Sequence, residues 1–202
     1  MKKAVSLFFI LCLVAPSLAF CPPDPKIIPQ CADISAIGIF LSDGKSTRKI
    51  LGKLKYCCFN EEIMEKESLY YNRNRKEIIR IVPFCGGYEG EVAQFEISSA
   101  FLPPKEKVPV LRGIKTFVTG KKIKLGMSKM DIMSILGNRC VTETKKDNIT
   151  KLAYKIPDPS RPECAAVNNS DFLDYYNEPE YFSEYTFADG KLIRIYFGFH
   201  ES

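Results

Sequence analysis

The sequence contains a single histidine, and this restricts the catalytic and metal chemistry that it could carry. His200 lies two residues from the C-terminus, where chain ends commonly fray, so it makes a poor general base or metal ligand. A Ser-His or Cys-His nucleophile pair would depend on this residue alone. Paired carboxylates such as Glu61 and Glu62 stand among polar residues, as in solvated turns. We therefore expect no enzyme activity, no metal ion and no cofactor.

Nucleotide-binding and redox motifs are incomplete. Gly44-Lys45-Ser46-Thr47 resembles the end of a phosphate-binding loop, but that motif needs a glycine at position 39, which is Ile39. The adjacent Cys57 and Cys58 do not form the Cys-x-x-Cys motif of disulfide exchangers. The sequence also has no long basic run, so it gives little reason to expect a nucleic acid or an anionic membrane as partner.

The N-terminus has the three zones of a secretory signal peptide. Lys2 and Lys3 precede an apolar run over residues 4–15, which is too short to span a bilayer, and small residues suit cleavage after Ala19. No other segment is apolar enough to span a membrane. Cleavage before Cys21 would instead give a lipoprotein, but Phe20 is too large for that signal. We expect a periplasmic or secreted protein, with a bacterial origin favoured by the two lysines and a eukaryotic one left open.

Cleavage would leave 183 residues (202 minus 19), a net charge of +3 (5 minus 2) and seven cysteines (8 minus 1). In an oxidising compartment most of these cysteines should form structural disulfides. Zinc is the alternative, but zinc sites need close Cys or His pairs at fixed spacing, and the only close pair is Cys57 and Cys58. An odd number leaves one free thiol or one intermolecular bridge.

A short helix is predicted within residues 125–137. Ser128 can cap its first free amides, Asp131 places a carboxylate near the positive end, and Gly137 can adopt the left-handed conformation that ends it. A weaker copy occupies residues 41–52, and both copies end in Ile-Leu-Gly. Each copy is followed by a long stretch rich in β-branched and aromatic residues.

Period-two patterns predict strands after each helix. Ala93, Phe95, Ile97 and Phe101 follow one Gly-containing turn, and Ile193, Ile195, Phe197 and Phe199 follow another, which predicts two hairpins. Gln94 and Glu96 in the first strand, and Arg194 and Tyr196 in the second, fall on the opposite face. Earlier strands are expected over 68–73, 77–82, 151–156 and 183–187.

The repeated order of helix and strands predicts an α+β fold made of two tandem repeats, each a short helical N-terminal part packed on an antiparallel β-sheet. The domain boundaries are a signal peptide (1–19), a Pro-rich N-terminal segment (20–31), repeat unit 1 (32–101), a linker (102–113) and repeat unit 2 (114–202). The final strands are 100 positions apart and the helix ends 85 (137 minus 52), so the second unit carries an insertion, placed over 157–180.

The motif over residues 123–137, followed by strands that end in 187–195, resembles the superfamily of the beta-lactamase inhibitory protein and the small outer-membrane assembly lipoproteins. The first unit departs from it, with Ser42-Asp43-Gly44 where the pattern has Gly-Met-Ser. The resemblance implies a non-catalytic, exported protein-binding module, such as an enzyme inhibitor or an envelope assembly factor, whose sheet surface docks on another protein. It places Arg194 and Tyr196 on that surface.

The resemblance also implies a disulfide within each repeat, beginning shortly after the helix. It therefore pairs Cys140 with Cys164 and Cys58 with Cys85, leaves Cys57 free, and leaves Cys21 to pair with Cys31 across the Pro-rich segment. Whether Cys57 or Cys58 forms the bridge stays open.

The acidic and aromatic stretch 171–185 is the most unusual local composition. Tyrosine is favoured at protein interfaces, so Tyr175, Tyr176 and Tyr181 are candidate partner contacts. The alternative is an inserted loop whose rings cover the open end of the sheet. Two other function classes remain: a carrier of a lipid or small apolar ligand, and a secreted hydrolase whose acid residues go unrecognised.

Overall fold

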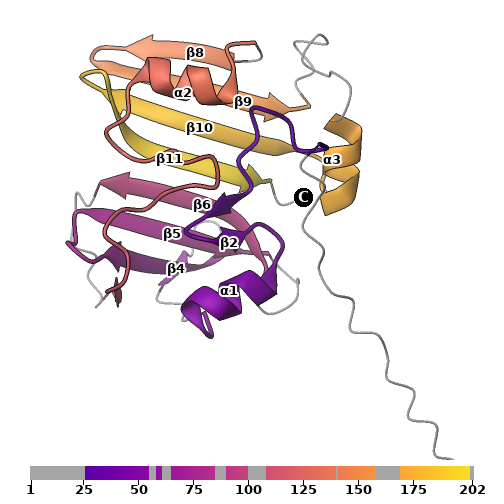
Figure 1. Ribbon diagram of the computed structural model, residues 1–202, viewed down its shortest axis with the longest axis vertical. Coiled ribbons are helices and arrows are strands. Elements are labelled where there is room, and N and C mark those ends of the chain that lie inside the picture. Colours follow the sequence, from indigo (N-terminus) through magenta and orange to yellow (C-terminus); the bar gives the residue numbers. More distant parts are fainter. Residues whose placement is uncertain are drawn as a thin grey trace, which may run out of the picture.

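The computed structural model has an α+β fold dominated by one mostly antiparallel sheet (Figure 1). It describes residues 26–54, 58–60, 65–84, 90–99, 108–139, 141–157 and 169–200. Within these residues the sheet has nine strands. Eight of them follow the order β3 (Cys58–Asn60), β4 (Glu65–Asn72), β5 (Glu77–Pro83), β6 (Val92–Ser99), β11 (Lys191–Phe199), β10 (Tyr181–Ala188), β9 (Ile149–Ile156) and β8 (Val141–Lys146).

The strand order makes the two predicted units halves of one sheet. Strands β3 to β6 and strands β8 to β11 each form an antiparallel meander, and the last strands of the two meanders, β6 and β11, pair at the centre. Helix α1 (Gly44–Leu51) precedes the first meander and helix α2 (Lys129–Leu136) precedes the second. The expected strands are therefore confirmed as β4, β5, β6, β9, β10 and β11.

Helix α2 begins and ends at the predicted residues. The Ser128 side chain accepts from the Asp131 amide and the Asp131 side chain accepts from the Ser128 amide, which is a complete capping box. Gly137 has φ 84° and its amide donates to the Met133 carbonyl. Helix α1 uses Asp43 as its N-cap and Gly52, at φ 71°, as its C-cap. Local sequence alone accounts for both helices.

One buried cluster joins the three helices to the same face of the sheet. It includes Ile132 and Leu136 of α2, Phe172 of helix α3 (Asn169–Tyr176), and alternate residues of the strands such as Ile97 and Ile195. The hairpin of β1 (Ser35–Ala36) and β2 (Ile39–Phe40) packs on this face too. The opposite face carries the other set of alternate residues, and no helix or hairpin in the described part of the chain packs on it.

Helix α3 lies in the connection between β9 and β10, where the insertion is predicted; residues 158–168 lie outside the described part of the chain. The expectation of a loop is wrong for 169–176. Phe172 and Tyr176 are spaced by four, so one side of the helix packs both rings against Phe199 of β11. These rings cover one end of the sheet, as one of the two interpretations of this stretch proposed.

The expected linker 102–113 contributes to the sheet. Strand β7 (Val110–Leu111) lies within it and pairs in parallel with β4 at Tyr71 and Asn72. The Asn72 side chain holds this region by donating to the Lys115 carbonyl at 2.7 Å and accepting from the Lys76 amide at 3.0 Å. Residues 108–113 are therefore part of the folded unit, because a buried asparagine and a strand pairing fix them.

Candidate functional site

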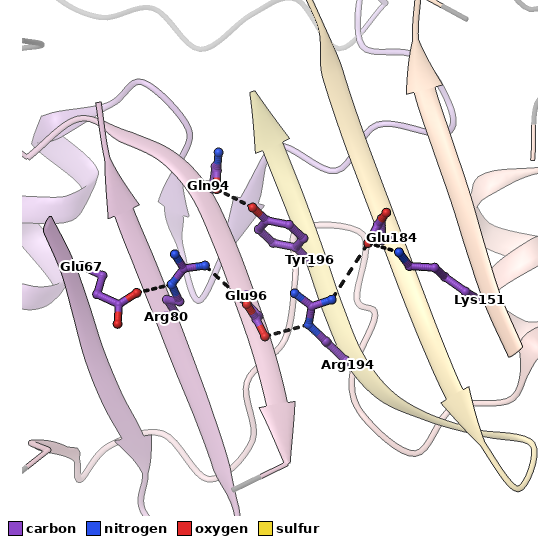
Figure 2. A network of polar contacts seen from close by, with 8 residues as sticks. All are labelled: Glu67, Arg80, Gln94, Glu96, Lys151, Glu184, Arg194 and Tyr196. Carbon is purple, nitrogen blue, oxygen red and sulfur yellow. Dashed lines mark hydrogen bonds and ion pairs between the residues drawn. The ribbon is translucent and has the colours of Figure 1, made fainter. Parts of the chain in front are cut away.

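The uncovered face of the sheet carries a row of alternating charges, which we call the charge ladder (Figure 2). It crosses six neighbouring strands from β4 to β9, with one side chain from each. In order along the sheet the members are Glu67, Arg80, Glu96, Arg194, Glu184 and Lys151. Three positive and three negative groups make the ladder neutral.

Register explains why these side chains meet. Arg80 lies directly opposite Glu96, whereas Arg194 lies diagonally across from both Glu96 and Glu184. Long side chains reach diagonal neighbours on one face of a sheet. Arg80 Nε bonds Glu67 Oε2, Arg80 Nη1 lies 3.5 Å from Glu96 Oε2, and Arg194 Nε donates to Glu96 Oε1 at 2.7 Å. Glu96 therefore joins the two arginines.

The second half of the ladder is looser and more exposed. Arg194 Nη1 lies 4.0 Å from Glu184 Oε2, and Lys151 Nζ lies 2.7 Å from the same oxygen. The exposed fraction of the side chains is 19% at Glu96 but 39% at Lys151. Solvent screens exposed pairs, so the tightest electrostatic coupling lies at the centre of the sheet.

The two arginines are held as cations. Burial acts to lower the pKa of Arg80, but the hydrogen bond and charge of Glu67, then the charge of Glu96, raise it overall. The hydrogen bond that Arg194 donates to Glu96 is the main cause that raises the pKa of Arg194 against its burial. Each guanidinium is thus fixed in place by carboxylates on neighbouring strands.

Tyr196 stands at the centre of this face, directly opposite both Glu96 and Glu184. Its hydroxyl donates to Gln94 Oε1 at 2.6 Å, and the Arg194 guanidinium lies 4.9 Å from the centre of its ring. Phe182 packs edge-on against the same ring at 4.7 Å. The arginine and the two rings form a packed cluster in which Arg194 and Tyr196 are half-buried and Phe182 is buried.

An apolar area flanks the ladder on the first meander. Leu69 and Tyr71 of β4 and Ile78 of β5 share the face with Arg80, because Leu69 lies opposite Arg80 and Tyr71 opposite Ile78. All three are half-buried. The face therefore combines apolar, aromatic and guanidinium groups, which is the composition enriched in the cores of protein interfaces.

The structure separates the predicted contact residues into two groups. Arg194 and Tyr196 lie on the uncovered face, as the alternation in β11 indicates. Tyr175 lies on α3 and is 39% exposed, but Tyr176 and Tyr181 are core residues, and Tyr181 is fully buried. The Tyr181 hydroxyl accepts from the Asp33 amide and donates to the Asp33 carbonyl. Tyr176 and Tyr181 therefore hold the fold together, and of these three tyrosines only Tyr175 is placed to contact a partner.

Sequence reasoning missed the other ladder residues. These are Glu67, Arg80, Glu184 and Lys151. The strands of Arg80 and Glu184 were predicted, and alternation with buried neighbours could have marked these two residues as outward, but they were not singled out. No local pattern indicates the strand order that brings β5, β10 and β9 into line with β6 and β11. The missing signal was the pairing between the strands.

The predicted disulfides stay predictions. Cys31 is half-buried and forms no disulfide with any described residue, and burial raises the pKa of its thiol; its predicted partner, Cys21, lies outside the described residues. Cys21, Cys57, Cys85, Cys140 and Cys164 lie outside the described residues, as does the side chain of Cys58.

Within the described residues, no group of three or more His, Cys, Asp or Glu side chains gathers as metal ligands would. No helix in the same residues is long and apolar enough to cross a membrane. Comparison with known proteins finds no matching family model, no matching curated protein and no matching solved structure.

Proposed function

We propose that this chain is an exported protein-binding module that docks on another protein of the cell envelope, or outside the cell, through the uncovered face of its sheet. The observation that carries the proposal is the cluster of Arg194, Tyr196 and Phe182, set in the charge ladder. Tyrosine and arginine are the residues that most often dominate binding energy at interfaces. The side chains are already held by neighbours, so little rotamer freedom would be lost on binding.

The tandem duplication belongs to the same proposal, and matched hydrogen bonds support it. The Ser42 amide, just before α1, donates to the Val92 carbonyl at 2.9 Å, and the Gly126 amide, just before α2, donates to the Leu192 carbonyl at 2.8 Å. Ser42 and Gly126 both have positive φ, and the acceptors are 100 positions apart (192 minus 92). The same chain geometry thus ties each helix to the last strand of its own meander.

The centre of the sheet repeats the relation. Under a shift of 100 positions Glu96 corresponds to Tyr196, and these two residues pair with each other. Gln94 then corresponds to Arg194, so the Tyr196 to Gln94 contact matches the Glu96 to Arg194 contact. A twofold relation between the meanders accounts for this, and supports the proposed duplication. The proposed interface lies on that axis.

Site-specific photo-crosslinking in the native envelope tests the proposed face. We expect a photoreactive residue at Thr186, on the same face in β10, to capture one partner protein. A matched probe at Met130, which is 72% exposed on α2 at the opposite side, should not capture it. Capture from Met130 but not from Thr186 would place the interface on the helical side and contradict the proposal.

Binding measurements with the captured partner then identify the contact residues. Tyr196→Ala or Arg194→Ala should weaken binding by about 30-fold, which corresponds to a loss of about 2 kcal/mol. Tyr175→Ala tests the α3 surface and Met130→Ala serves as control. A loss at Tyr175 with none at Tyr196 would move the interface to α3.

A further inference from the structure

A pocket of about 550 Å³ opens on the helical side of the sheet, away from the charge ladder. Its walls are the β1–β2 hairpin and the segment 118–122, with Ile28 from the chain that precedes the hairpin. Pockets of roughly 300 to 1,000 Å³ lined mainly by apolar groups are typical sites for small molecules. Here Ile28, Ile34, Ile37, Phe40 and Val118 supply the apolar lining.

Hydrogen bonds fix the two walls against each other. The Gly120 amide donates to the Ser35 carbonyl at 2.8 Å and the Ile37 amide donates to the Val118 carbonyl at 2.9 Å. A Cβ at Gly120 would lie 2.4 Å from Ser35 Oγ, so a larger residue there would displace the Ser35 side chain from this close contact. The pocket is thus built into the fold before any ligand arrives.

Two residues in the pocket wall hold an unfavourable backbone conformation. Ile37 has φ 51° and Lys122 has φ 68°. The left-handed region costs a β-branched residue such as Ile37 about 1–3 kcal/mol. Ile37 and Gly38 form the two-residue loop of the β1–β2 hairpin, where a tight turn needs positive φ at both positions. The Ile37 to Val118 hydrogen bond ties this turn to the segment 118–122 and so shapes the pocket wall.

The accessible charge in the pocket is positive. Asp33 is 1% exposed, and its carboxylate is occupied by the amides of Ser35 and Lys121 at 3.5 and 3.2 Å and by the Thr119 hydroxyl. Lys121 is half-buried and Lys122 exposed. A ligand therefore meets an apolar wall with two cationic side chains.

We propose that this pocket binds an amphipathic anion, with its apolar chain against Ile34, Ile37 and Val118 and its charged head at Lys121 and Lys122. The proposal is independent of the docking face, because the two sites lie on opposite sides of the sheet. A ligand here could be carried while a partner is bound.

Titration calorimetry on the mature chain, below the micelle-forming range of each probe, tests the ligand chemistry. Decanoate should bind, and decanol should bind about 5-fold more weakly because it lacks the negative charge that Lys121 and Lys122 can pair with. Decyltrimethylammonium should bind more weakly than decanol. Comparing the affinity of decyl phosphate with that of decanoate shows whether the pocket prefers a phosphate or a carboxylate head group. No binding of any anionic probe, or equal affinity for decanoate and decanol, overturns the proposal.

Variants locate the site. Lys121→Gln with Lys122→Gln should weaken decanoate binding about 5-fold and leave decanol unchanged, while Lys146→Gln on β8 serves as the matched charge control. Val118→Trp should fill the pocket and remove binding of both probes, with Leu69→Trp on the other face as control. If Val118→Trp does not fold, the surface lysine variants still decide the question. Loss of decanoate binding in Lys146→Gln or Leu69→Trp alone would place the site elsewhere.

Discussion

Replacement of Glu96 by glutamine tests whether the charge ladder is one coupled network. Glutamine keeps the shape of the side chain and one acceptor oxygen but removes the charge that joins Arg80 to Arg194. Arg80 keeps Glu67, whereas Arg194 keeps only Glu184, at 4.0 Å. The variant should therefore weaken mainly the interactions of Arg194, whose hydrogen bond to Glu96 is 2.7 Å long.

The expected decrease in the free energy of unfolding follows from the type of hydrogen bond that is weakened and from the burial of Glu96. A hydrogen bond to a charged group contributes about 1.5–3 kcal/mol. The Glu96 side chain is 19% exposed, so partial screening reduces this figure to about 1–2 kcal/mol. For a chain of this size the midpoint of thermal unfolding should fall by about 2–8 °C. Lys129→Gln breaks the more exposed pair with Glu143 and should cost under about 0.5 kcal/mol.

Urea denaturation of the mature chain measures both variants. A double-mutant cycle of Glu96→Gln and Arg194→Gln should give a coupling free energy of about 1 kcal/mol. High salt should reduce this coupling less than it reduces the effect of Lys129→Gln, because the central pair is less exposed. A coupling free energy of zero would refute the idea that the charges on neighbouring strands form one coupled network. A Glu96→Gln variant that is no less stable than Lys129→Gln would refute it too.

Three further predictions concern the core and the cysteines. Gly198→Ala should lower the free energy of unfolding by about 3 kcal/mol in the same urea assay, because a Cβ there would lie 2.2 Å from the Ala93 carbonyl oxygen, where β6 meets β11. The control Gly113→Ala should cost under about 0.5 kcal/mol, because a Cβ at Gly113 would have open space around it. Burial raises the pKa of Asp33 in the folded state above its unfolded value, so the contribution of Asp33 to stability is lost as pH rises from about 4. Asp33→Asn should remove this fall from the pH profile of the free energy of unfolding. An unchanged profile in the variant would contradict the prediction. Thiol titration of the denatured mature chain should find one free cysteine if the predicted pairing is right, and more than two would overturn it.

The predictable part of the fold rests on short-range patterns. The capping box of Ser128 and Asp131 and the stop at Gly137 act within one helix, so neighbouring residues suffice to predict α2. The alternation in β6 and β11 likewise marks one face of each strand as core, and it assigned Arg194 and Tyr196 to the outer face correctly. Such patterns work because helix caps and strand periodicity involve residues that are close in sequence.

The candidate site depends on pairing between residues far apart in sequence. The chain had to place β11 beside β6, and in one particular register, before Glu96 could join Arg80 to Arg194. A slip by one residue would turn the ladder into the core. Tertiary packing also buried Tyr176 and Tyr181, which local composition marked for contact with a partner.

Sequence by itself thus determined helices α1 and α2, the positions of β4, β5, β6, β9, β10 and β11, and the outward residues of β6 and β11, since local chemistry sets all of these. Tertiary structure alone decided that the two meanders form one continuous sheet, that a charge ladder crosses its centre, and that the segment 118–122 closes a pocket against the β1–β2 hairpin. Those arrangements come from burying one face of every strand in a shared core, which no local pattern records.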